Sequence, residues 1–134
     1  MKRNIYVQFK QHQGQGNNPW SFFMEKNMNT EKIKHLNDSL RKTFANGKIV
    51  ITPGVRALGL NKQQQLFSKV KSFDNFSKDN DPYGEHDFGC ITLGKQQFFW
   101  KIDYYDVDYQ CLSPAPDDEN VTNRVLTIMC AEEY

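Results

Sequence analysis

The segment DNDPYGEHDFG, residues 79–89, holds four carboxylic acids and one histidine within eleven positions. Such side chains bind cations, transfer protons or attract a basic partner. A calcium-binding EF-hand loop needs an oxygen ligand at its fifth position and a glutamate at its twelfth, but counting from Asp79 these positions are Tyr83 and Cys90. The segment therefore does not fit an EF-hand, and we expect no metal and no cofactor.

Proton transfer requires a second group that sets the tautomer of the histidine. A two-residue turn at Gly94–Lys95 would place His86 opposite Asp103 in a hairpin, with Glu85 close by. A small enzyme or metal-binding protein that uses His86 with Asp103 or Glu85 is therefore one alternative. The sequence contains no GxSxG motif and no glycine-rich phosphate loop, and a histidine–aspartate pair on a sheet is more often structural. We therefore expect no enzymatic activity.

Recognition of a basic partner is favoured by the distribution of charge along the chain. Residues 1–73 contain 13 Lys/Arg and 3 Asp/Glu, a balance of +10, whereas residues 74–134 contain 4 Lys/Arg and 13 Asp/Glu, a balance of −9. Tyrosines are interleaved with these carboxylates, and tyrosine is enriched at interface hot spots. We expect an acidic face that docks on a basic protein surface. The residues expected to form it are Asp79, Asp81, Tyr83, Glu85, Asp87, Asp103, Tyr105, Asp106 and Asp108.

The basic N-terminal half gives a second alternative, direct binding of nucleic acid. Several cations fall on or near two expected helices and would contact phosphates if they shared a face. They are Lys32, Lys34, Arg41, Lys42, Lys62, Lys69 and Lys71. No helix-turn-helix, zinc finger or single-strand aromatic platform accompanies them, so this alternative is less favoured than protein binding.

The cysteines and the apolar runs bear on cellular location. Cys90, Cys111 and Cys130 show no CxxC spacing, which argues against a disulfide framework and a zinc site. No signal-peptide pattern is present at the N-terminus, and no run approaches the roughly 20 apolar residues that span a bilayer. We expect a cytoplasmic protein without membrane contact.

Local patterns predict the elements that position these side chains. Asp81-Pro82-Tyr83-Gly84 matches a type I turn. Apolar spacing and capping residues predict a helix that begins at Thr30 as its N-cap. The other expected elements are a strand at 48–52, a helix at 61–73, and a hairpin of strands 88–93 and 96–105 in which Phe88 pairs with Lys101.

The C-terminal pattern is ambiguous. Val121, Val125, Ile128 and Met129 are helically spaced and favour a last helix, although the β-branched content of VLTIM also suits a strand. Residues 4–9 alternate like an edge strand. The chain is therefore predicted to be α+β, with a small antiparallel sheet, a central hairpin and about three helices packed on it. Residues 1–29 would form an N-terminal extension and residues 30–134 a single domain.

Three sequence motifs, taken in order, resemble a family of small uncharacterised bacterial and phage proteins, a domain of unknown function. The motifs are DNDPYGEHDFG, FFWKIDYYD and RVLTIM. The resemblance extends from about Thr30 to Tyr134 and includes LNDSLRKTF and ITPGV. No activity or ligand comes with the family. The occurrence of its members on phages and mobile elements implies an inhibitor or adaptor, for example an anti-CRISPR that acts on a host nucleic-acid-targeting defence complex.

Overall fold

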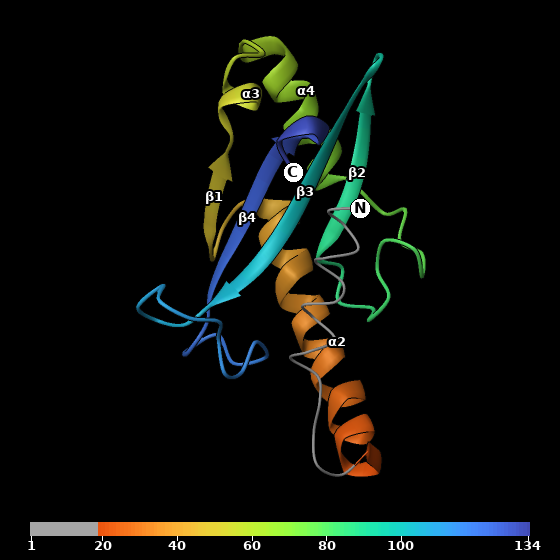
Figure 1. Cartoon of the computed structure of the whole chain (residues 1–134), viewed down its shortest axis with the longest axis vertical. Coiled ribbons are helices and arrows are strands. Elements are labelled where there is room, and N and C mark those ends of the chain that lie inside the picture. The colour runs from red at the N-terminus through yellow and green to blue at the C-terminus, as the bar shows by residue number, and fades with distance from the viewer. Residues whose placement is uncertain (1–18) are drawn as a thin grey trace.

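The computed structural model describes the backbone of residues 19–134 and the side chains from Asn29 onward, and the expected strand at 4–9 lies outside the described residues. Within this part the chain forms three α-helices, four strands and a short 3-10 helix (Figure 1). In chain order they are α2 (Pro19–Thr43), β1 (Lys48–Ile51), α3 (Pro53–Arg56), α4 (Leu60–Lys71), β2 (Phe88–Leu93), β3 (Gln96–Tyr105), β4 (Asn123–Cys130) and η1 (Ala131–Glu133).

The four strands form one sheet in the order β1-β4-β3-β2. The predicted hairpin is confirmed, because β2 and β3 are antiparallel with Phe88 opposite Lys101 and Leu93 opposite Gln96. β3 and β4 are also antiparallel, whereas β1 runs parallel to β4. The α+β class with a small sheet is thus confirmed. The sheet is mixed instead of wholly antiparallel because the chain leaves β1 through helices and a hairpin and returns beside it in the same direction.

α2 and α4 cover one face of the sheet (Figure 1). Alternate residues of β3 and β4 point toward them, as strand geometry requires. Each fully buried aliphatic side chain contributes roughly 1.5–3 kcal/mol to folding. The centre of this core consists of Leu40, Leu66, Val70, Trp100, Ile102, Leu126 and Ile128.

The expected C-terminal helix is wrong, since residues 123–130 form strand β4. This strand pairs with β1 on one side and β3 on the other, and most of its residues are buried. A strand that is buried on both faces loses the polar–apolar alternation, so its apolar residues also fit a helical period. The β-branched residues Val125, Thr127 and Ile128 carried the correct signal.

The expected start of the first helix is also wrong. α2 begins at Pro19, and Thr30 lies inside it instead of capping it. Proline is favourable at the first helical position because its missing N–H has no partner there in any case. α2 therefore spans the predicted boundary between residues 29 and 30. None of the described helices has the length and apolar character needed to cross a membrane.

Candidate functional site

The carboxylates of DNDPYGEHDFG point mostly inward. Asp81, Glu85 and Asp87 are 8%, 9% and 4% exposed. The predicted turn is confirmed, because the Gly84 N–H donates to the Asp81 carbonyl at 3.2 Å. Asp81 Oδ1 then accepts the His86 N–H at 3.0 Å. Burial raises the pKa of Asp81, and this hydrogen bond opposes the rise.

Three of the nine expected docking residues are therefore buried, and the side chains of two of them, Asp81 and Glu85, accept hydrogen bonds within the protein. Of the other expected residues in this segment, Asp79 is exposed and Tyr83 is half-buried. Residues 74–87 between α4 and β2 thus form an ordered loop, which we call the latch loop.

The expected pairing of His86 with Asp103 is wrong. His86 has a positive φ of 56°, which breaks the extended backbone just before β2. Its Nδ1 lies 2.9 Å from Asp38 Oδ1 on α2, and its ring stacks on Phe76 at 3.8 Å. Asp103 instead pairs with Lys101 at 2.7 Å. The register of the hairpin, from which the pairing was predicted, gives no information about α2, and α2 carries Asp38, the residue that His86 contacts.

A buried polar network joins α2 to the sheet and to the latch loop. Asn37 donates to the Tyr104 hydroxyl at 2.7 Å and to the Glu85 carbonyl at 3.0 Å. Its Oδ1 accepts from Arg124 Nε at 2.9 Å, and Tyr104 donates to Glu85 Oε1 at 3.4 Å. Burial lowers the pKa of Arg124, and Tyr104 and Glu85 oppose this shift. The sequence signal for this network was a polar residue, Asn37, within the apolar stripe of a helix.

The acidic residues after β3 have the opposite surroundings. From Ile102 to Asn123 the chain contains no lysine or arginine. We call residues 105–119 the acidic segment. Its five carboxylates are half-buried or exposed, and none of them forms an ion pair with another described residue. They are Asp106, Asp108, Asp117, Asp118 and Glu119.

Hydrogen bonds fix the backbone of the acidic segment at both ends. The Asp106 N–H donates to the Cys111 carbonyl at 2.9 Å, which closes a compact turn. Asn123 Nδ2 donates to the carbonyls of Asp106 and Val107, each at 3.1 Å. Further along, Arg124 Nη2 donates to the Pro116 carbonyl. The segment is therefore anchored to β4, the central strand that follows it.

The acidic segment also carries exposed apolar surface. Val107 and Tyr109 are 57% and 49% exposed, and with Leu60 they are the exposed large hydrophobic residues of the described chain. The rings of Tyr105 and Tyr109 lie 6.1 Å apart, and Lys48 Nζ lies 5.5 Å from the Tyr109 ring centroid. An open groove of about 660 Å³ runs between Tyr109, Glu119 and the start of β1.

The structure thus separates the nine expected docking residues. Tyr105 is the last residue of β3, and Asp106 and Asp108 follow it directly. The latch loop instead lies beside β2, which is an edge strand of the sheet (Figure 1). Asp103 is half-buried beside Lys101. The nine residues expected to form the docking face did not include Val107 and Tyr109. The sequence pattern that could have indicated them is an apolar residue and a tyrosine that alternate with aspartates in a short irregular stretch.

The basic face expected from the N-terminal half is also divided. Arg41 is 1% exposed, and its Nη1 donates to the carbonyls of Val70 and Lys71. Lys34 pairs with Glu31 on the same helix. Five exposed lysines remain on or beside α2 and α4: Lys32, Lys42, Lys62, Lys69 and Lys71.

No cluster of three or more potential metal ligands is present among residues 29–134, the part with described side chains.

The fold defines a small α+β domain in which a mixed sheet of four strands is covered on one face by two longer helices. The chain belongs to the DUF3768 family, described as proteins of unknown function, whose model matches residues 51–133. Neither the curated proteins nor the solved structures include a match to the chain.

The family match confirms the expected resemblance to a domain of unknown function. It covers α3, α4, the hairpin, the acidic segment and β4, and it begins at the last residue of β1. The expected extension of the resemblance back to Thr30 lies outside the match. The association with phages and mobile elements stays a prediction.

Proposed function

We propose that this protein is a non-enzymatic binding module that docks the acidic segment on a basic surface of another protein. One observation carries the proposal. Exposed Val107 and Tyr109 alternate with Asp106 and Asp108, on a backbone that hydrogen bonds hold in place.

Each part of this combination has a role in association. A tyrosine supplies a large contact area at low cost in side-chain entropy, so Tyr109 is the expected anchor. The carboxylates around it attract a basic surface and favour fast, specific encounter more than raw affinity. Because the loop backbone is already ordered, little conformational entropy is lost on binding.

Two cations limit how acidic this surface is. Lys48 lies against the Tyr109 ring, and buried Arg124 interacts electrostatically with Asp117 and Glu119. Asp106, Asp108 and Asp118 are outside both interactions, and of these Asp106 and Asp108 adjoin the exposed Val107 and Tyr109. Asp108 is exposed, whereas Asp106 is half-buried and its Oδ1 accepts the Gln110 N–H at 2.9 Å. We therefore assign the largest electrostatic contribution to this pair.

A protein that binds nucleic acid is the partner class that best matches the acidic segment. Its phosphate-binding groove is rich in lysine and arginine, and an acidic face with aromatic anchors competes for the same charges. Inhibition of a host nucleic-acid-targeting defence complex, as by an anti-CRISPR, is one specific form of this proposal. It predicts that nucleic acid and this protein exclude each other from the partner.

The test is charge reversal, after affinity capture from the source organism has supplied a purified partner. Asp106→Lys with Asp108→Lys should lower the association rate about tenfold or more at low salt and flatten its salt dependence. The matched control, Asp74→Lys with Glu132→Lys, makes the same charge change at two exposed positions outside the acidic segment. If both double variants bind like the wild type, the acidic segment is not the docking surface.

A further inference from the structure

A cavity of about 300 Å³ lies where α2, the end of α4 and the latch loop meet. It is separate from the acidic segment and concentrates several groups that bind anions or exchange protons. The lining residues that matter here are Asp38, Arg41, Lys42, Lys71, Phe76 and His86.

His86 is held so that one ring nitrogen remains available. Its Nδ1 is engaged by Asp38 at 2.9 Å. The nearest carboxylate oxygen to Nε2 is Asp81 Oδ2 at 3.8 Å, beyond hydrogen-bond distance. The side chain is about a quarter exposed. Stacking on Phe76 fixes the ring plane, and the backbone φ of 56° is a conformation that non-glycine residues seldom adopt without a compensating role.

Arg41 places a buried positive charge behind the cavity. Its guanidinium lies 5.5 Å from the Phe76 ring centroid and 5.3 Å from that of Trp100. It donates to Asp38 at 3.1 Å and to the last carbonyls of α4, whose partial negative charge it offsets. Its buried Nε has no hydrogen-bond partner among the described residues.

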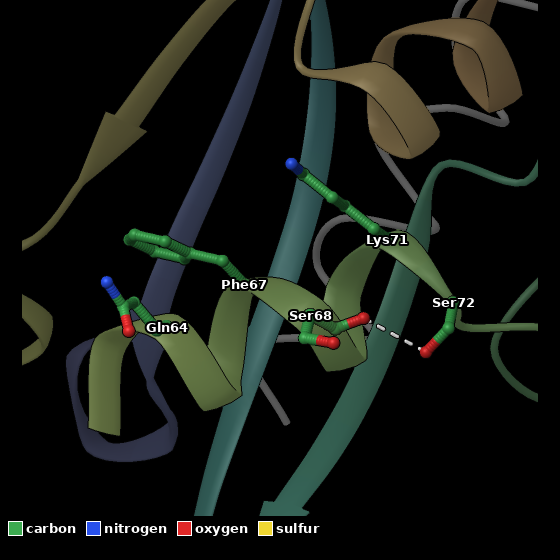
Figure 2. Close-up of a pocket in the computed structure, with 5 residues that line it drawn as sticks. All are labelled: Gln64, Phe67, Ser68, Lys71 and Ser72. Carbon is green, nitrogen blue, oxygen red and sulfur yellow. Dashed lines mark hydrogen bonds between the residues drawn. The ribbon is translucent and has the colours of Figure 1, made fainter. Parts of the chain in front are cut away.

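The charges around the cavity favour an anion. Arg41, Lys42 and Lys71 line the cavity together with two carboxylates, Asp38 and Asp74, and Asp38 is already engaged by Arg41 and His86. A third carboxylate, Asp81, lies 3.8 Å from His86 Nε2, and burial raises its pKa, which favours its neutral form. A second, open groove of about 500 Å³ adjoins this cavity and shares Lys71 and Ser72 with it. Figure 2 shows Phe67 and Lys71 extending from the same side of α4 in this groove. The pair of cavities thus offers cations for a charged group and aromatic rings for an apolar one.

We infer that this cavity binds a small phosphate-bearing molecule, with the phosphate oxygens between Lys42, Lys71 and His86. Phosphate suits the site because lysine binds it as a point charge. With Nδ1–H donating to Asp38, His86 Nε2 accepts a hydrogen bond from a phosphate O–H when the ring is neutral and donates one to a phosphate oxygen when the ring is protonated. The volume is that of a small-ligand pocket and is too small for a macromolecular interface. The site is independent of the proposed docking through the acidic segment.

The test is an NMR titration of the full chain with inorganic phosphate, with chloride at matched ionic strength as the reference. We expect saturable shifts of the His86 ring nitrogens and of the Lys42 and Lys71 backbone amides. Lys42→Gln with Lys71→Gln should weaken binding about tenfold. The control, Lys62→Gln with Lys69→Gln, removes the same charge from α4 and should leave it unchanged.

His86→Asn is the third variant, because asparagine tolerates a positive φ and so preserves the fold while removing the imidazole. Retention of the wild-type amide spectrum with weaker phosphate binding supports the site. Three results overturn it: shifts that do not saturate, equal weakening in the control double variant, or unchanged phosphate affinity in His86→Asn.

Discussion

The latch loop and the acidic segment have similar compositions but different environments. Each holds several carboxylates and at least one tyrosine within a short irregular stretch. In the latch loop, three carboxylates are buried and two of them have identified partners, with Asp81 accepting the His86 N–H and Glu85 the Tyr104 hydroxyl. In the acidic segment the five carboxylates are half-buried or exposed, and none forms an ion pair with another described residue.

The difference follows from what surrounds each segment. The latch loop passes between α2 and the edge of the sheet, so its polar groups lose water and need hydrogen-bond partners. The acidic segment follows β3, and its contacts include turns of its own backbone, hydrogen bonds from β4 and the Lys48 side chain of β1 against the Tyr109 ring. The sequence therefore shows that a segment is rich in carboxylates. The residues that pack around the segment in the fold determine which of these carboxylates are buried and which remain accessible to water.

The largest effect is expected for the network that secures the latch loop. Asn37→Ala leaves the Arg124 Nε donor without its acceptor and removes the donor to the Glu85 carbonyl, all in the interior. We expect a loss of about 3–5 kcal/mol in the free energy of unfolding, measured by urea denaturation. His35→Ala, at an exposed site of the same helix, should stay within about 0.5 kcal/mol. A loss below about 1 kcal/mol for Asn37→Ala would contradict the role of the network.

The contrast between the two segments is tested by one carboxylate from each. Asp81→Ala removes the acceptor of the His86 N–H and should cost about 1–3 kcal/mol. Asp108→Ala removes an exposed carboxylate and should change stability by less than about 0.5 kcal/mol. Equal losses in urea denaturation would show that the two segments do not differ as described.

The expected features that the structure confirms are those encoded locally. The Gly94–Lys95 turn set the register of β2 and β3, and Asp81, Pro82 and Gly84 specified their own turn. Such signals lie within a few residues and need no knowledge of the rest of the chain.

The features that sequence reasoning missed depend on distant partners. His86 binds Asp38, 48 positions away, and the parallel pairing of β1 with β4 joins residues that are more distant still. Burial of β4 on both sides removed the alternation that identifies an ordinary strand. Charge balance identified the acidic half, but it could not distinguish the inward carboxylates of the latch loop from the outward ones of the acidic segment.

A smaller, pH-dependent effect is expected at the C-terminus, outside both segments. Glu133 accepts hydrogen bonds from Thr52 Oγ1 at 2.6 Å and from the Cys130 and Gly54 N–H groups at 2.9 Å, which lower its pKa from 4.5 to about 2. Because the folded pKa lies below the unfolded one, this carboxylate stabilises the fold fully above pH of about 4.5, and the contribution is lost as the pH falls to about 2.

The measurement is the melting temperature of Glu133→Gln against wild type as a function of pH. The variant should melt lower at pH 7, and the difference should shrink steadily between about pH 4.5 and pH 2. Glu132→Gln, at the neighbouring exposed position, is the control. A difference for Glu133→Gln that does not depend on pH would contradict the assigned hydrogen bonds.

The smallest effect concerns thiol chemistry and leaves stability unchanged. Cys90 and Cys111 are exposed, whereas Cys130 is buried, and its burial together with the nearby Glu133 carboxylate raises its pKa to about 11. In a labelling experiment with a thiol reagent at neutral pH, two thiols should react quickly and Cys130 only on unfolding. Fast modification of Cys130 in the native state would show that this end of β4 is open.

Site-specific cross-linking from position 109 tests the docking surface most directly. A photo-reactive amino acid replaces Tyr109 in one variant and Leu60 in another, since Leu60 is a similarly exposed apolar residue outside the acidic segment, 66% exposed against 49%. We expect position 109 to cross-link to the partner, at or beside its lysine-rich or arginine-rich surface, and position 60 not to do so. Cross-linking from position 60 with none from position 109 would contradict the assignment of the acidic segment as the binding face.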